Sequence, residues 1–343
     1  MSNLNKIPVT ILTGFLGAGK TTLVRSLIVN NKSKRLAVII NEFGDLGVDG
    51  EIIKECSDDS CPAENILELA NGCICCTVAD DFVPTMKILL EGKYLPDHIL
   101  IETSGLALPK PLLKAFEWPE IRSRLTVDSV LAVVDAEAVY NGTFAPETSS
   151  ELTQKQEETF VEHETPLSEV FEDQINCADV ILLTKPDLVK DLKIVKNIIQ
   201  EELQRSLPIL EVENGKIDQR LILGLNAEAE SDLEQRKSHH DGFDDHEHDD
   251  FETFNIPLVP LKDVETFKDL LQKLINENEI LRVKGFLEVE GKSLKLLVQA
   301  VGKRLSVNFT NTDLGVSGLG NLVVIAEKNK VSANLFTEQL LND

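Results

Sequence analysis

A glycine-rich segment near the start of the chain has the spacing of a phosphate-binding loop. It reads GFLGAGKTT over residues 14–22, which satisfies G-x-x-x-x-G-K-[ST]. Glycines let backbone N–H groups surround phosphates, the lysine reaches the β and γ oxygens, and the threonine ligates magnesium. The predicted nucleotide ligands are Gly14, Phe15, Leu16, Gly17, Ala18, Gly19, Lys20, Thr21 and Thr22, with Thr21 also on Mg²⁺. The alternative is a glycine turn that binds nothing.

A cluster of cysteines is the second candidate for chemistry. Cys73, Cys75 and Cys76 lie within four residues, in NGCICCT, and an extended backbone with a turn brings two or three thiolates together. Thiolates suit zinc, cobaltous, cuprous or iron–sulfur chemistry and exclude magnesium and calcium. The alternatives are buried cysteines in a core and a redox dithiol. Cys56 and Cys61 are either outer ligands or part of a structural loop, and Cys177 is expected in the core.

A variant guanine motif follows later in the chain. Thr184-Lys185-Pro186-Asp187 resembles N-K-x-D, in which the aspartate accepts both N1–H and N2–H of guanine, a donor pair that adenine lacks. Thr184 stands where Asn is usual. We expect Thr184, Lys185 and Asp187 to bind the base, which favours GTP over ATP, and the alternative is a loop turned by Pro186.

Two further loops carry groups suited to the phosphates and to magnesium. Glu102 ends an apolar run and is expected to support Mg²⁺, directly or through water, while Gly105 is expected to offer a backbone N–H to the γ-phosphate. Glu42, with Asp45, lies in a switch-like loop after another apolar run. These two acids are either magnesium-site groups or solvated loop residues. No residue is predicted to be the hydrolytic group.

These residues require a particular set of elements to hold them. Apolar runs of strand length precede each loop, and segments long enough for helices separate them. Continuous apolar runs are typical of parallel strands covered on both faces. We therefore predict an α/β G domain with a mostly parallel sheet, and its predicted strands are Ile7–Leu12, Arg35–Asn41, His98–Glu102, Val127–Asp135 and Val180–Thr184.

The second half of the chain has a different pattern. Strands are predicted at 254–259, 281–289, 294–301, 305–308 and 322–326, with helices near 263–276 and 331–341, which is a small α+β domain. The predicted organisation is a GTPase domain over 1–225 with an acidic insertion near 141–170, a linker over 226–252, and a C-terminal domain over 253–343. The linker contains His239, His240, His246 and His248, which either hold divalent metal loosely or belong to a solvated spacer.

Length and charge limit the classes of partner. A chain of 343 residues is long enough for about two domains. The formal net charge is 34 − 58 = −24, which repels phosphate backbones and anionic membranes and argues against nucleic-acid or membrane binding. The clustered cysteines and the lack of a signal-peptide pattern predict a reducing, cytoplasmic location.

Taken in order, GFLGAGKTT, NEFG, GCICC and ETSGLA resemble the CobW family of metal-handling GTPases, and TKPD extends the match to residue 187. The resemblance implies a SIMIBI-type G domain, a CobW C-terminal domain, low intrinsic GTPase activity and metal cargo at Cys73, Cys75 and Cys76. Longer stretches resemble the branch linked to cobalt insertion in cobalamin biosynthesis.

The resulting hypothesis is a GTP-dependent metallochaperone. Mg-GTP orders the loops on both sides of the cysteines and closes a Co²⁺ site, and hydrolysis releases the ion to a metal-accepting chelatase or metalloenzyme. The alternatives are a GTPase of the same family that delivers Zn²⁺, a metal-storage protein with a regulatory nucleotide site, and a nucleotide kinase. The oligomeric state is not predicted.

Overall fold

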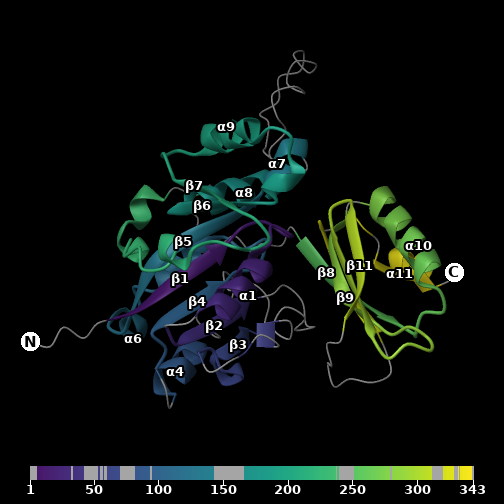
Figure 1. Ribbon diagram of the computed structural model, residues 1–343, viewed down its shortest axis with the longest axis horizontal. Coiled ribbons are helices and arrows are strands. Elements are labelled where there is room, and N and C mark those ends of the chain that lie inside the picture. The colour runs from purple at the N-terminus through teal and green to yellow at the C-terminus, as the bar shows by residue number, and fades with distance from the viewer. Residues whose placement is uncertain are drawn as a thin grey trace, which may run out of the picture. The chain divides into compact units, whose positions relative to one another are not determined.

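The computed structural model describes residues 6–31, 34–41, 53–54, 57, 60–69, 82–92, 95–142, 166–236, 238, 251–278, 280–310, 320–327, 331 and 333–341. These residues form two compact units (Figure 1). The first comprises the described residues of 6–41 and 57–238, and the second comprises those from 251 onward together with 53–54. No helix in the described ranges is long and apolar enough to cross a membrane.

The first unit is built on a seven-stranded sheet with the order β3-β2-β4-β1-β5-β6-β7, in which every neighbouring pair is parallel. The prediction of a mostly parallel α/β sheet is confirmed. Its strands are β1 (Ile7–Thr13), β2 (Leu36–Asn41), β3 (Ile66–Leu69), β4 (His98–Glu102), β5 (Leu125–Asp135), β6 (Val180–Thr184) and β7 (Ile209–Val212). All residues of β2, β4 and β6 are buried, as expected for strands covered on both faces.

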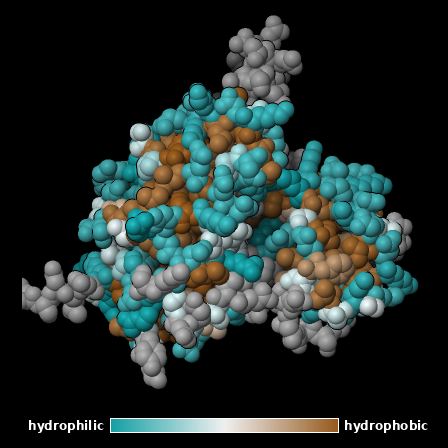
Figure 2. All heavy atoms as spheres, in the orientation of Figure 1, coloured by the Kyte–Doolittle hydropathy of each residue, from teal (hydrophilic) through white to brown (hydrophobic). Residues whose placement is uncertain are grey.

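Helices connect these strands and cover the sheet (Figure 1). They are α1 (Lys20–Asn30), α4 (Val83–Glu91), α5 (Pro109–Ala115), α6 (Pro119–Arg122), α7 (Ala136–Asn141), α8 (Pro166–Asn176) and α9 (Leu192–Glu202), with 3-10 turns η1 (Ala63–Asn65), η3 (Pro186–Leu188), η4 (Gln219–Leu221), η5 (Ala229–Ser231) and η6 (Leu233–Gln235). The expected insertion near 141–170 contributes its two ends to α7 and α8, and its centre lies outside the described residues. Figure 2 shows this face of the unit as a mixture of hydrophilic and apolar areas, as is usual for a globular surface.

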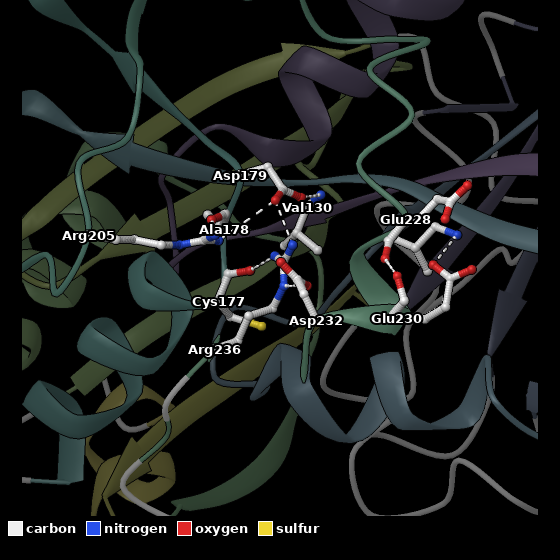
Figure 3. A network of polar contacts seen from close by, with 11 residues as sticks. Val130, Cys177, Ala178, Asp179, Arg205, Glu228, Glu230, Asp232 and Arg236 are labelled. Carbon is white, nitrogen blue, oxygen red and sulfur yellow. Dashed lines mark hydrogen bonds and ion pairs between the residues drawn. The ribbon is translucent and has the colours of Figure 1, made fainter. Parts of the chain in front are cut away.

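Residues 226–236 are part of the first unit, although their acidic composition placed them in the predicted linker. Arg236 is fully buried, and its guanidinium bonds Asp179 and Asp232, each at 2.6 Å, and the Cys177 carbonyl (Figure 3). Burial lowers the pKa of Arg236, but the hydrogen bonds that its guanidinium donates to the two carboxylates outweigh this effect, and the pKa is raised. Asp232, an acidic residue of this segment, is thus the partly exposed partner of a buried cation, a role that charge counting does not distinguish from a solvated spacer.

Further hydrogen bonds hold the same segment. We call residues 226–236 and 238 the strap. The carboxylate of Glu230 accepts hydrogen bonds from Thr126 Oγ1 (2.6 Å) and Val127 N (2.9 Å) at the start of β5. Ser238 Oγ donates to Asp173 Oδ2 of α8 at 2.5 Å. The strap is thus fixed along its length, and the exact domain boundaries remain a prediction.

The second unit is a five-stranded antiparallel sheet with the order β11-β10-β9-β12-β8. The strands are β8 (Phe251–Leu258), β9 (Ile280–Leu287), β10 (Lys295–Val301), β11 (Arg304–Thr310) and β12 (Gly320–Glu327), with α10 (Val264–Glu277) and α11 (Ala333–Leu341). Both helices contribute to the apolar core on one face of this sheet. The small α+β domain expected from the sequence is therefore confirmed.

Candidate nucleotide-binding site

The glycine-rich loop lies where an open parallel sheet offers a ligand site. Residues 14–19 connect β1 to α1, and β1 is the central strand, between β4 and β5. The loops that follow β1, β4, β5 and β6 all leave the same, carboxyl edge of the sheet because the four strands are parallel. Ligands of such sheets bind outside the carboxyl ends of the strands, near the point where the strand order reverses.

Two glycines of the loop are required by its geometry. Gly14 has φ 138°, and a Cβ there would lie 2.2 Å from the backbone oxygen of Val133 in β5. Gly19 has φ 100° at the N-cap of α1. The loop follows the neighbouring backbone so closely, and with such dihedrals, that an L side chain would distort it. Its amides are therefore presented at the positive end of α1, as an anion site needs.

Lys20 is held over this loop. Its Nζ donates to the carbonyl oxygens of Gly14 (2.6 Å) and Phe15 (3.2 Å), and the residue is only 8% exposed. The ammonium group is thus positioned at the start of the loop by backbone acceptors. A phosphate oxygen there would exchange neutral carbonyl partners for a charged one, which strengthens the hydrogen bond.

The predicted magnesium ligands from two distant segments lie together. Thr21 Oγ1 donates to Glu102 Oε1 at 2.7 Å, which joins the first turn of α1 to the end of β4. A hydroxyl and a carboxylate are hard oxygen ligands of the kind that Mg²⁺ prefers, so these residues fit the ion. Glu42, the third predicted ligand, and Asp45 lie outside the described residues.

The variant guanine motif is joined directly to the phosphate loop. Thr184 Oγ1 donates to Ala18 O at 2.7 Å and lies 3.1 Å from Val134 O, and Lys185 Nζ donates to Gly17 O at 3.0 Å. Lys185 has a left-handed backbone, with φ 53°. Asp187 lies in η3 with an exposed side chain. The motif therefore sits beside the phosphate loop and leaves one carboxylate accessible for a base.

Asp135 is a site residue that the sequence analysis did not single out. Its Oδ2 accepts a hydrogen bond from Lys185 Nζ at 2.6 Å, while its Oδ1 caps α7 by accepting from Glu137 N and Ala138 N. The side chain of Asp135 is 5% exposed and that of Lys185 is 31% exposed. This partly buried ion pair fixes the lysine that crosses the phosphate loop. The only local signal was an aspartate at the end of an apolar strand.

Two other close approaches complete the surroundings of the loop. A Cβ on Gly105, after β4, would lie 2.4 Å from Leu16 Cδ2, so this glycine touches the phosphate loop directly. A Cβ on Gly215, in the turn after β7, would lie 2.9 Å from the Thr22 carbonyl oxygen. Gly105 was predicted to be in the site and Gly215 was not, because a single Asn-Gly pair indicates only a turn.

The predicted metal residues are not placed by the structure. Cys73, Cys75, Cys76 and Cys56 lie outside the described residues, and so do His239, His240, His246 and His248. Within the described part of the chain, no group of three His, Cys, Asp or Glu side chains could hold an ion. Cys61 is buried, and burial raises the pKa of Cys177 to about 12, which keeps it a protonated thiol in the core as expected.

Comparison with known proteins places these motifs in a family. Residues 8–217 match the family described as CobW/HypB/UreG, nucleotide-binding domain, and residues 259–341 match the one described as the cobalamin synthesis protein cobW C-terminal domain. A protein of Sinorhizobium sp named zinc chaperone CobW is 49% identical over 310 residues, 89% of this chain and 88% of that protein. One of the same name from Pseudomonas aeruginosa is 47% identical, over 90% of this chain and 84% of its own. The zinc chaperone YjiA of Escherichia coli is 30% identical, over 89% of both chains.

Proposed function

The chain belongs to the CobW/HypB/UreG family of P-loop GTPases, and we propose that it is a GTP-dependent metallochaperone. The observation that carries the nucleotide half of this proposal is the direct joining of the T-K-P-D segment to the phosphate loop. Thr184 and Lys185 bond the carbonyls of Ala18 and Gly17, so a base beside Asp187 and phosphates at Lys20 belong to one site. GTP hydrolysis is the reaction expected there, at a low intrinsic rate.

The metal half of the proposal assigns the cargo to Cys73, Cys75 and Cys76. These residues lie in sequence between Glu42 and Glu102, the two carboxylates predicted on either side for magnesium. We propose that Mg-GTP orders both flanking loops and closes the thiolate site, and that hydrolysis releases the ion. The receiver would be a metal-accepting chelatase or metalloenzyme in the cytoplasm.

Zinc replaces cobalt as the favoured cargo. The sequence resemblance pointed first to Co²⁺ and to cobalamin biosynthesis, with Zn²⁺ as the alternative. Three relatives with 49%, 47% and 30% identity all carry the name zinc chaperone, which supports Zn²⁺. Zinc also binds thiolate sites more tightly than cobalt in the general order of divalent metals. Cobalt delivery would therefore need control of free zinc or a special site geometry.

A competitive metal titration tests the proposal. The protein is titrated with Co²⁺ in the presence of Mg²⁺ and either a non-hydrolysable GTP analogue or GDP, and thiolate-to-cobalt absorption is followed before Zn²⁺ is added. We expect strong absorption with the analogue, its displacement by about one equivalent of Zn²⁺ per site, and its loss in Cys75→Ala. Cys177→Ala is the matched control because that thiol is buried and protonated. The thiolate-to-cobalt absorption of this variant should equal that of the unaltered protein.

Three results would contradict the proposal at different points. Binding that ignores the nucleotide would refute the switch and favour storage. Absorption that survives in Cys75→Ala would move the metal site elsewhere. Failure of Zn²⁺ to displace Co²⁺ would return the cargo assignment to cobalt.

A further inference from the structure

Gln174 is an amide almost completely buried in α8, with 1% of its surface exposed. Its helical neighbours Phe171 and Ile175 belong to the apolar core of the first unit. Burying a polar side chain among apolar ones lowers the stability of the fold unless the side chain forms hydrogen bonds. Gln174 forms two, and both are made to the loop that follows β4.

The two hydrogen bonds hold both ends of one short turn. Gln174 Nε2 donates to Gly105 O and to Ala107 O, each at 3.1 Å. The opposite orientation of the amide would place its oxygen against two carbonyl oxygens, so the network itself determines which atom faces the loop. Among the described residues, Gln174 Oε1 has no hydrogen-bond partner. The amide is thus used only as a donor to this loop.

The same loop is fixed from its other side by the phosphate loop. A Cβ on Gly105 would lie 2.4 Å from Leu16 Cδ2 and 2.8 Å from Leu16 N. Gly105 therefore lies between Leu16 and Gln174, and neither side leaves room for the loop to move without breaking a contact. The carbonyl oxygen of Gly105 accepts its hydrogen bond from Gln174 in α8.

We propose that Gln174 is a positioning residue that holds the Gly105 loop where the γ-phosphate is read. The proposal rests on the nucleotide site described above. Gln174 is buried and both of its hydrogen bonds are made to the loop, so it acts through the orientation of that loop, in which the Gly105 N–H is the group predicted to bind the γ-phosphate. Because GDP lacks the γ-phosphate, loss of Gln174 should weaken GTP binding and leave GDP binding nearly unchanged.

Gln174→Met tests this because methionine has a similar length and no donor. The affinities of Mg²⁺ with a non-hydrolysable GTP analogue and of Mg²⁺ with GDP are measured by calorimetry on the full chain. We expect the analogue to bind about tenfold more weakly, the loss of one to two neutral hydrogen bonds, and GDP to change less than about threefold.

Asn176→Leu is the matched control. Asn176 is a buried amide on the same helix, but it bonds Glu202 O at 3.2 Å and Gln204 N at 2.9 Å, away from the site. Its substitution should lower stability and leave the ratio of the two affinities unchanged. Equal weakening of both nucleotides by Gln174→Met would show a purely structural role and overturn the inference.

A measurement on the unaltered protein keeps the test decisive if Gln174→Met does not fold. Amide hydrogen exchange of residues 104–108 should slow when the GTP analogue replaces GDP, and residues 172–176 of α8 should slow with them. Exchange that is identical with both nucleotides in both segments would overturn the inference. Failure of the unaltered protein to bind either nucleotide would instead refute the proposed function, so the two failures are distinguishable.

Discussion

His98 makes the stability of the first unit depend on pH. It begins β4 with no exposed surface, its Nε2 lies 2.8 Å from Thr10 Oγ1, and its Nδ1 has no hydrogen-bond partner among the described residues. Burial and, to a smaller extent, the charge of Lys34 together lower the pKa of His98 to about 4, against the opposing effect of Asp128. The imidazole is therefore neutral in the folded protein across the physiological range.

The sign and size of this pH effect on stability follow from the protonation of His98 in the folded and unfolded states. The unfolded chain binds a proton at His98 near pH 6.5 and the folded chain does not until about pH 4. The stabilisation is therefore complete above pH 6.5 and is lost as the pH falls toward 4. Each pH unit in that range is worth about 1.4 kcal/mol, so lowering the pH from 6.5 to 5 should cost about 2 kcal/mol at this residue.

Urea unfolding at a series of pH values measures this loss. Trp118 is the only tryptophan and packs against the core of the first unit, so its fluorescence reports on that unit alone. His98→Gln provides a variant that cannot titrate, and the five other histidines are common to both proteins. The difference in unfolding free energy between the two proteins should shrink by about 2 kcal/mol from pH 6.5 to 5. A difference that stays constant over this range would refute the reasoning.

Three further substitutions have defined outcomes. Gly14→Ala should abolish nucleotide binding, because its Cβ would meet a backbone oxygen at 2.2 Å, and calorimetry with GDP should detect no heat of binding. Asp135→Asn keeps an acceptor for the cap of α7 but removes the charge beside Lys185, so GDP should bind about tenfold more weakly, whereas Asp191→Asn at the N-cap of α9 should have no effect. Arg236→Met leaves two carboxylates without their buried partner and should destabilise the first unit by about 3 kcal/mol in urea unfolding, and a loss below about 1 kcal/mol would contradict the buried ion pair.

The sequence predicted the parts of this protein whose signal is local. The phosphate loop is a run of nine residues between a strand and a helix, and both elements are where the pattern placed them. All ten predicted strands are present, with ends that differ by up to three residues. The strands that were missed, β3 and β7, are four residues long and lie at the two edges of the sheet, so their apolar pattern is too short to recognise.

The remaining features depend on contacts between distant residues. Asp135 and Lys185 are 50 positions apart, and the Gln174 amide reaches a carbonyl 69 positions earlier. Arg236 is a buried cation inside a segment that reads as a charged spacer. Residue type alone does not reveal such pairs, because a charged or amide side chain has the same local pattern whether it is solvated or buried against a partner.

The central place of β1 determines when the first unit can fold during synthesis. β1 is made first among the strands, yet its neighbours are β4 and β5, with Val9 opposite Ile99 and Thr10 opposite Ser129. The unit is complete only when Arg236 reaches Asp179, after 236 − 13 = 223 further residues. At about 5–20 residues per second this takes about 10–45 seconds on the ribosome. The seven-residue strand β1 lacks its final partners for the first 135 − 13 = 122 of these residues, until β5 has been made, so the nascent chain is most prone to aggregation before β5 emerges.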